Sequence, residues 1–238
     1  MTPRARPAPP LLEARVGPAR IWCSGRVDGN IGDHVGDDPA AVTRNRAALA
    51  ERIGSVAHRG WVWLRQVHGA EVYVATGPGR GPAPLADAAV TNVRGLALAI
   101  VTADCAPLVV ACDDAVGVVH AGYRGLAAGV IESAIAALRD VGTGDVRAYL
   151  APCIRAASYE FGPDDLAPFV AQFGPGVAGR TRAGRPALDI PAAIRVVLER
   201  SGVVGLDDSS LCTADSTGYF SYRRDGETGR QATIAVLP

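Results

Sequence analysis

Hydrophobic residues along the chain follow two different periods, one typical of strands and one of helices. Short apolar runs rich in β-branched residues and bounded by Gly, Pro or Asp predict strands. These runs are WVWLRQV, AEVYVA, LALAIVTA, PLVVAC, VGVVHA, VRAYLAP and ATIAVL, at residues 61–67, 70–75, 96–103, 107–112, 116–121, 146–152 and 232–237. Asp113 and Asp114 supply a turn between two of them.

Apolar residues at helical spacing predict four helices. They fall within residues 36–54, 125–139, 162–174 and 188–202. The first has Asp38 as a cap, Pro39 in its first turn and Gly54 at its end, and the last has Asp189 and Gly202 in the same roles. Because strands and helices intermix along the chain, we expect one α/β or α+β domain with mixed sheets over residues 19–238.

The amino terminus differs from the rest of the chain. Residues 1–18 carry prolines and positive charge but no apolar core segment, which indicates a flexible tail rather than a secretory signal. No apolar run of 18 residues occurs, so the sequence predicts no membrane-spanning helix. Five cysteines without CxxC spacing favour reduced thiols and a cytoplasmic location.

Charge excludes several classes of function. The 24 basic residues balance 24 acidic ones, so neither nucleic acid nor a membrane surface is an expected partner. All 24 basic residues are arginine, and the absence of lysine excludes a Schiff-base lysine and a P-loop lysine.

Three side chains that can bind a metal follow or end predicted strands. They are His68, Cys105 and His120, and each lies beside a turn that contains Gly or Pro. The ends of strands present reactive groups to clefts in many α/β proteins. The spacing matches no short zinc motif, so the residues alone leave a metal site, a Cys–His nucleophilic pair and simple packing open. The other four cysteines are expected to pack as small apolar residues.

Charged residues near these three add candidates for catalysis. Asp104 stands in an apolar segment, where burial without partners is costly, so it caps a turn or handles protons. Arg124 stands near a predicted helix start, which makes it a candidate for phosphate binding or a plain surface residue. The Arg223–Arg224 pair is expected to be solvated, or to help hold an anion.

Seven motifs in order make the chain recognisable. From about Trp22 to the carboxyl terminus it resembles the YfiH/laccase-domain family, once described as multicopper polyphenol oxidases. The motifs are NIGDHVGDDPAAVTRNRAAL, RQVHGAEV, ADAAVT, TADCAPLVV, VVHAGYRGL, APCI and SYRRDGETGRQA. Two departures concern the shape of the pocket: the family commonly has Trp at Tyr123 and Gly at Ala151.

The resemblance implies a fold and an activity. It implies a single domain of mixed β-sheets sandwiched between helices, with a Zn²⁺ ion held by His68, Cys105 and His120. It also implies phosphorolysis of adenosine, inosine, guanosine and 5′-methylthioadenosine, and deamination of adenosine, so a purine nucleoside and phosphate are the expected partners. Three protein ligands leave one zinc position open, as in catalytic sites. We expect Cys105 to hold the metal, Asp104 to handle protons and Arg124 to position phosphate.

Other functions are compatible with the same residues. A metal-free hydrolase or amidase acting on cell-wall precursors would use Cys105 as the nucleophile and His120 as its base. A copper polyphenol oxidase is disfavoured, since four histidines are too few for its copper sites. A zinc-stabilised binding domain is a further alternative. The sequence leaves the oligomeric state open and is compatible with a monomer.

Overall fold

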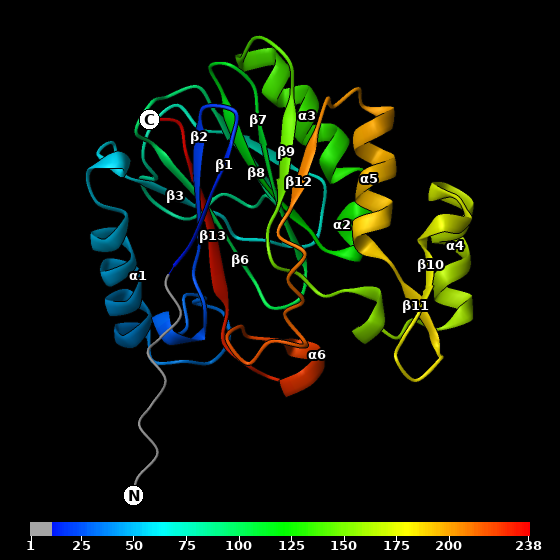
Figure 1. The fold of residues 1–238 in the computed structure, drawn as a ribbon. Coiled ribbons are helices and arrows are strands. Elements are labelled where there is room, and N and C mark those ends of the chain that lie inside the picture. Colours follow the sequence, from blue (N-terminus) through cyan, green and yellow to red (C-terminus); the bar gives the residue numbers. More distant parts are fainter. Residues whose placement is uncertain (1–10) are drawn as a thin grey trace, which may run out of the picture.

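Two β-sheets stack face to face at the centre of the molecule (Figure 1). The computed structural model describes residues 11–238. One sheet has the strand order β1 (Leu12–Val16), β2 (Ala19–Cys23), β13 (Gln231–Val236), β6 (Ala97–Thr102) and β3 (Trp61–Trp63). The other has the order β12 (Leu206–Asp208), β9 (Arg147–Leu150), β7 (Ala106–Ala111), β8 (Val116–Ala121), β5 (Ala88–Thr91) and β4 (Val72–Val74). Each sheet contains parallel and antiparallel pairs.

Helices cover the outer faces of both sheets, which completes a four-layer arrangement (Figure 1). α1 (Pro39–Ile53) packs on the first sheet. α3 (Val130–Val141) packs on the second sheet, and α5 (Ile190–Arg200) packs against α3. α4 (Pro163–Phe173) lies beyond α5, beside a small hairpin of β10 (Ala178–Arg180) and β11 (Pro186–Leu188) (Figure 1). The predicted fold of mixed sheets between helices is therefore confirmed.

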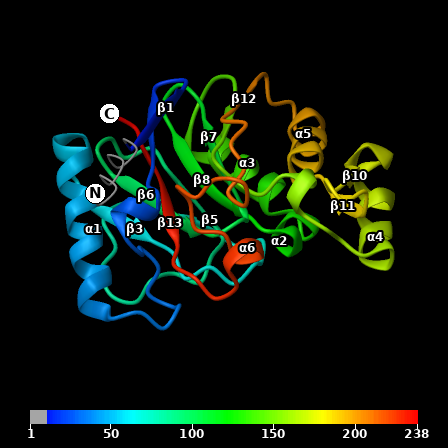
Figure 2. The ribbon, with the colours of Figure 1, turned by 60° about the horizontal axis from the view of Figure 1, so that its bottom comes forward.

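The short helices lie at the ends and turns of the main elements. α2 (Tyr123–Ala127) follows β8, and α6 (Tyr222–Asp225) precedes β13. Seen from the end of the sheets in Figure 2, α6 lies in front of β13 and on the same side of the molecule as α2. Four 3₁₀ turns complete the elements: Arg26–Asp28, Gly54–Ala57, Ala156–Ser158 and Pro175–Val177.

Central strands are apolar on both faces because both faces are covered. In β6, Leu98 and Ile100 point between the sheets, while Ala99 and Val101 point toward the helix layer of α1. The same alternation occurs in β7, and the side-chain period of two explains it. This pattern explains why these segments appear in the sequence as unbroken hydrophobic runs.

Helix ends follow the predicted caps. Asp38 accepts a hydrogen bond from the backbone N–H of Ala40 at the start of α1, and Gly54 ends that helix with φ +68°. Asp189 accepts one from Ala192 at the start of α5. These side-chain oxygens satisfy amide groups that have no partner within the helix.

One predicted helix is divided in two. The single helix expected over residues 125–139 is instead α2 and α3, with a break at Gly129. Gly129 has φ +87°, a left-handed conformation that ends one helix and allows the next to start in a new direction. The hydrophobic spacing predicted the buried face of α3 but could not show this change of direction.

The predicted tail is too long at its carboxyl end. Residues 12–16 form β1, which pairs antiparallel with β2 from Leu12↔Cys23 to Val16↔Ala19, so the boundary at residue 18 is wrong. The alternation of Leu12, Ala14 and Val16 with charged residues is a strand pattern that proline-rich composition obscured. Residues 1–10 of the predicted tail lie outside the described residues.

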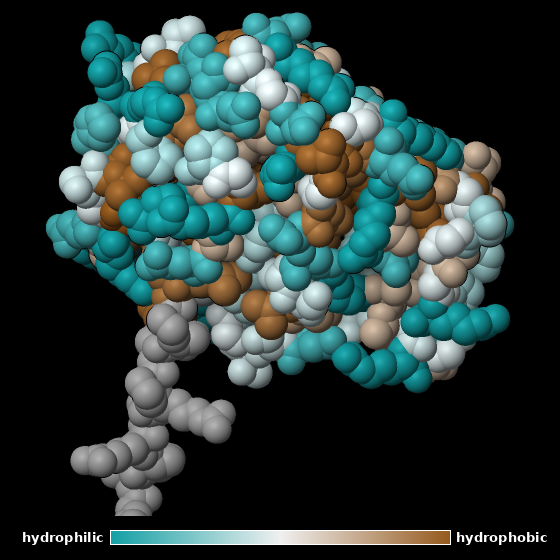
Figure 3. All heavy atoms as spheres, turned by 45° about the horizontal axis from the view of Figure 1, so that its top comes forward, coloured by the Kyte–Doolittle hydropathy of each residue, from teal (hydrophilic) through white to brown (hydrophobic). Residues whose placement is uncertain are grey.

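The surface is mixed in character. On the face shown in Figure 3, hydrophilic residues cover most of the area and hydrophobic residues form separate patches. Within residues 11–238 no helix is long and apolar enough to cross a membrane. Four cysteines, Cys23, Cys112, Cys153 and Cys212, are free and buried, as predicted for apolar packing.

The break at Gly129 yields a test of the fold. Alanine at this position meets no close atom but must adopt φ +87°, so Gly129→Ala is expected to lower the free energy of unfolding by about 1 kcal/mol. Gly176→Ala, at a site with open space and no positive φ, is the matched control and should change it by less than about 0.5 kcal/mol. Urea denaturation measures both, and equal stability of the two variants would contradict the strain argument.

Candidate metal centre

Three residues that are far apart in the sequence meet at one end of the sheets. His68 lies in the loop between β3 and β4, Cys105 in the turn between β6 and β7, and His120 in β8. Their ligand atoms lie within 4.8 Å of one another, with 3.8 Å between Cys105 Sγ and His68 Nε2. His68 is exposed, Cys105 is half-buried and His120 is buried, so the cluster is open on the His68 side.

The backbone around the cluster is unusual. His68 has φ +60° and Asp104 has φ +95°, and Ser210 is the one other non-glycine residue of the described chain with positive φ. Such conformations cost free energy and occur often at functional sites. A Cβ atom at Gly122 would lie 2.8 Å from His68 Cδ2 and 3.1 Å from Cys105 Sγ. Glycine is therefore required at this position for the cluster to assemble.

A buried carboxylate, Asp87, holds two members of the cluster in place. Its Oδ1 lies 2.8 Å from His120 Nδ1 and accepts the backbone N–H of His68 at 2.9 Å. Its Oδ2 accepts the N–H groups of Val67 and Gly69 at 3.1 and 2.7 Å. Because Nδ1 of His120 is bound to Asp87, Nε2 is the nitrogen left to face Cys105.

Sequence reasoning missed Asp87. The signal that could have found it is an acid within the apolar motif ADAAVT, which is the same signal that drew attention to Asp104. Asp87 is completely buried. Burial raises the pKa of its carboxyl group, but the contact with His120 and the backbone N–H groups outweigh burial and lower it.

Charge distribution within the cluster favours a thiolate. Burial raises the pKa of the Cys105 thiol, but His120 and His68 outweigh it and lower the pKa to about 6. Burial lowers the pKa of His120, but the Cys105 thiolate and Asp87 raise it to about 9. A thiolate facing two imidazoles is a soft donor set suited to zinc or copper, in which the metal replaces the shared proton.

Asp104 is anchored on the opposite side of the Cys105 turn. Its Oδ1 accepts a hydrogen bond from Thr213 Oγ1 at 2.6 Å, and its Oδ2 accepts one from the backbone N–H of Arg223 at 2.7 Å. These bonds tie the turn that carries Cys105 to the start of α6. Asp104 is also the one carboxylate among the described residues that line the adjoining cavity.

A cavity of about 530 Å³ opens beside the cluster, which is within the size range of small-molecule sites. Three arginines line it: Arg124 from α2, Arg223 from α6, and Arg230 just before β13. Tyr123, Tyr159 and Tyr222 supply aromatic surface to the lining.

The four charged residues that the sequence offered as candidates differ in their position relative to the cavity. Asp104, Arg124 and Arg223 line the cavity, whereas Arg224 is absent from its lining. Arg224 binds Asp225 and the carbonyl oxygens of Thr213, Ser216 and Tyr219 instead. Sequence reasoning missed Arg230 and His34, which also line the cavity. Both lie within motifs of the family resemblance, SYRRDGETGRQA and NIGDHVGDDPAAVTRNRAAL, which could have drawn attention to them.

Comparisons with known proteins agree with this architecture. A protein named purine nucleoside phosphorylase from Streptomyces coelicolor is 44% identical over 214 residues, which cover 87% of each chain. Another of that name from Corynebacterium glutamicum is 38% identical and covers 100% of this chain and 98% of its own.

A solved structure supports the fold. The crystal structure of a Neisseria meningitidis protein of family DUF152 matches with a TM-score of 0.83 and 34% identity, over 95% of this chain and 98% of that chain. Residues 25–238 match the model of the family described as multi-copper polyphenol oxidoreductase laccase. The chain therefore belongs to this laccase-domain family, as its ordered motifs indicated.

Proposed function

We propose that the chain is a cytoplasmic, zinc-dependent purine nucleoside phosphorylase that also deaminates adenosine. The observation that carries the proposal is a single cavity in which the His68–Cys105–His120 cluster lies beside three arginines. Relatives of 38% and 44% identity that carry the name purine nucleoside phosphorylase support it. The proposed substrates are phosphate with adenosine, inosine, guanosine or 5′-methylthioadenosine.

Zinc fits the donor set better than copper. Two imidazole nitrogens and one thiolate fill three positions of tetrahedral zinc. A blue-copper site adds a weak axial ligand that is usually Met, and no methionine lines the cavity among the described residues. The chain has four histidines, too few for additional copper ions at a separate cluster. A bound zinc ion supplies Lewis acidity to the cavity.

Phosphorolysis balances without a further reactant. An oxygen of hydrogenphosphate forms a bond to ribose C1′, the C1′–N9 bond breaks, and its electron pair leaves with the purine. The proton of hydrogenphosphate passes to the purine, so the products are the free base and ribose 1-phosphate. We assign phosphate binding to arginines of the cavity, Arg124 among them, because guanidinium groups bind phosphate oxygens in pairs. Asp104, the carboxylate of the lining, is the proposed relay for the proton.

Deamination would use the same cavity. The oxygen of a water molecule bonds to purine C6, and the amino group leaves as ammonia after taking a proton, which yields inosine from adenosine. The cluster lines the cavity, and its exposed His68 side leaves it open to a ligand.

A metal-free Cys–His hydrolase acting on cell-wall precursors is the second candidate. The lowered pKa of Cys105, about 6, favours it because a thiolate beside an imidazolium is a nucleophile. The names of the relatives favour phosphorolysis instead. The two functions differ in whether the sulfur of Cys105 is bound to metal or free to react.

Zinc content and product identity test the main proposal. We expect about one zinc per chain, and conversion of adenosine to adenine and ribose 1-phosphate only when phosphate is present. His68→Ala and His120→Ala should lose zinc and activity because each removes one ligand, while circular dichroism reports an unchanged fold. Zinc-loaded protein that converts no nucleoside would refute the phosphorylase.

Alkylation of Cys105 separates the two candidates. A thiolate bound to zinc is protected, so zinc-loaded protein should resist iodoacetamide, and protein stripped with a chelator should be labelled at this residue. Peptide mass spectrometry locates the label, and the buried Cys23 serves as an internal control that stays unlabelled in both states. Stoichiometric labelling of Cys105 in zinc-loaded protein would instead favour the hydrolase.

The anchoring of the cluster by Asp87 leads to a further prediction. Asp87→Asn keeps the size of the side chain but removes the charge that orients His120, so zinc affinity should fall about 10- to 100-fold. Competition with a chromogenic chelator measures the affinity, and thermal unfolding of the metal-free variant checks its fold. Asp114→Asn is the control, because Asp114 also accepts a backbone N–H but does not line the cavity. Unchanged zinc affinity in Asp87→Asn would contradict the positioning role.

A further inference from the structure

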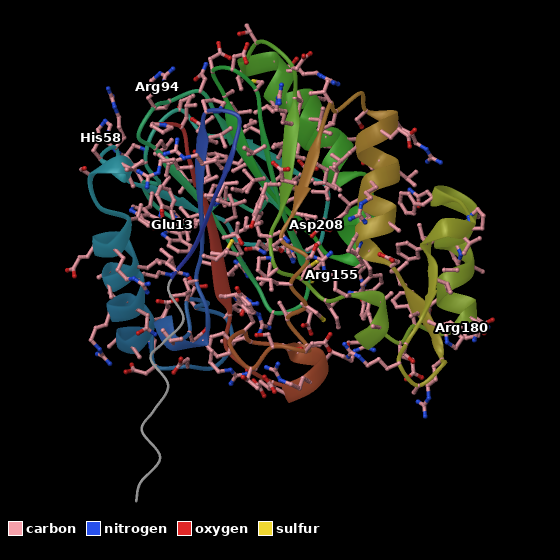
Figure 4. All side chains as sticks on the ribbon, viewed as in Figure 1. Glu13, His58, Arg94, Arg155, Arg180 and Asp208 are labelled. Atoms are coloured by element: carbon pink, nitrogen blue, oxygen red, sulfur yellow. The ribbon has the colours of Figure 1, made fainter. Side chains whose placement is uncertain are left out.

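The three arginines that line the cavity share a feature that favours the binding of an anion. Arg124, Arg223 and Arg230 form no salt bridge with any carboxylate among residues 11–238, although many other arginines of the chain do. Arg155, for example, binds both carboxylate oxygens of Asp208 at 3.0 and 2.7 Å (Figure 4). A guanidinium that lines a cavity without a carboxylate partner is suited to bind an anion from solution.

Arg230 is the member of this group that the fold holds most firmly. Its stem passes over Gly32, where a Cβ atom would lie 2.7 Å from Arg230 Cγ. Its backbone N–H donates to Asn30 Oδ1 at 2.8 Å, and its Nη1 donates to the carbonyl oxygens of Thr228 and Gly229 at 2.8 and 3.1 Å. The side chain is therefore fixed before any ligand binds, which reduces the entropy lost on binding.

The bonds of Arg230 leave one edge of its guanidinium unused. Nε and Nη2 donate to no acceptor among residues 11–238. These two N–H groups point in parallel and match two oxygens of a tetrahedral oxyanion. Arg230 is also half-buried, so a bond to it is less weakened by solvent than a bond to an exposed arginine.

Arg230 is the half-buried arginine of the cavity that Cys105 and Asp104 also line. Arg124 and Arg223, by contrast, are exposed. Arg124 donates through Nε to the hydroxyl of Tyr123, and Arg223 lies over the ring of Tyr159. Their guanidinium groups therefore lie beside tyrosines of the cavity wall.

We propose that Arg230 binds the reacting phosphate, with its Nε–Nη2 edge facing two phosphate oxygens beside the His68–Cys105–His120 cluster. The identity of the anion rests on the proposed phosphorolysis, whereas the position of the subsite rests on the geometry of Arg230. Arg124 and Arg223, at the exposed wall of the cavity, then attract the anion and supply further contacts to it. Phosphate held at Arg230 would lie on the metal side of the nucleoside.

Direct binding of inorganic phosphate tests this assignment without relying on catalysis. In ³¹P NMR titrations of zinc-loaded, full-length protein, Arg230→Gln should weaken phosphate binding at least about tenfold, since a charge-assisted hydrogen bond is lost. Arg230→Lys keeps the charge but loses the paired N–H groups, so it should fall between wild type and Arg230→Gln. Arg180→Gln is the matched control: Arg180, labelled in Figure 4, also donates to a carbonyl oxygen but does not line the cavity. Its phosphate affinity should equal that of wild type.

Kinetics separate this inference from the proposed function. If phosphorolysis occurs, Arg230→Gln should raise KM for phosphate at least about tenfold and leave KM for the nucleoside within about twofold. If phosphate binds through Arg230 but no phosphorolysis occurs, the oxyanion subsite stands and the phosphorylase fails. The subsite itself is refuted if wild type binds no phosphate. It is also refuted if Arg230→Gln, with normal zinc content and thermal stability, binds phosphate as tightly as wild type.

Discussion

The hydrogen bonds of one buried carboxylate, Asp87, determine the geometry of the site. An ionised group without contact to water is costly unless its oxygens are fully bonded, and Asp87 meets this requirement with three backbone N–H groups and one imidazole. The three N–H groups come from the loop that carries His68, and the imidazole is that of His120. The carboxylate thus fixes a loop and a strand relative to each other, and the position of each imidazole depends on the same two oxygens.

The stacking of the two sheets supplies the third member of the cluster. β6 belongs to one sheet and β7 to the other, so the short turn between them crosses from sheet to sheet and carries Cys105 to the end of the stack. Asp104 in this turn has φ +95° and is held by Thr213 and Arg223 of the carboxyl-terminal region. Gly122 leaves the space that His68 and Cys105 occupy. The strain of this turn is offset by bonds that come from distant parts of the chain.

Sequence patterns predicted the elements better than the site. Helix caps at Asp38 and Asp189 gave correct helix starts because capping is local, and apolar runs gave the central strands because both sheet faces are buried. Spacing could not assemble His68, Cys105 and His120, because their proximity depends on sheet stacking, and the family resemblance alone suggested them as a set. Asp87 and Arg230 were missed for the same reason, because residues that bond to them are distant in the sequence. The hydrogen-bond partners of Asp87 are 18–33 residues away, and Asn30, which accepts the backbone N–H of Arg230, is 200 residues away.

The three members of the cluster differ in burial, which determines the side from which a ligand can approach. His120 is buried and backed by Asp87, whereas His68 is exposed, so a ligand must reach the thiolate from the His68 side. The lining from α2, α6 and the segment before β13 brings arginine and tyrosine side chains to that approach. An anion is attracted by the arginines, and a flat aromatic base finds tyrosine surface. A nucleophilic cysteine would need only the inner pair of Cys105 and His120. The added arginines and the second imidazole fit the proposed function, in which the site binds a metal, an oxyanion and an aromatic ligand together.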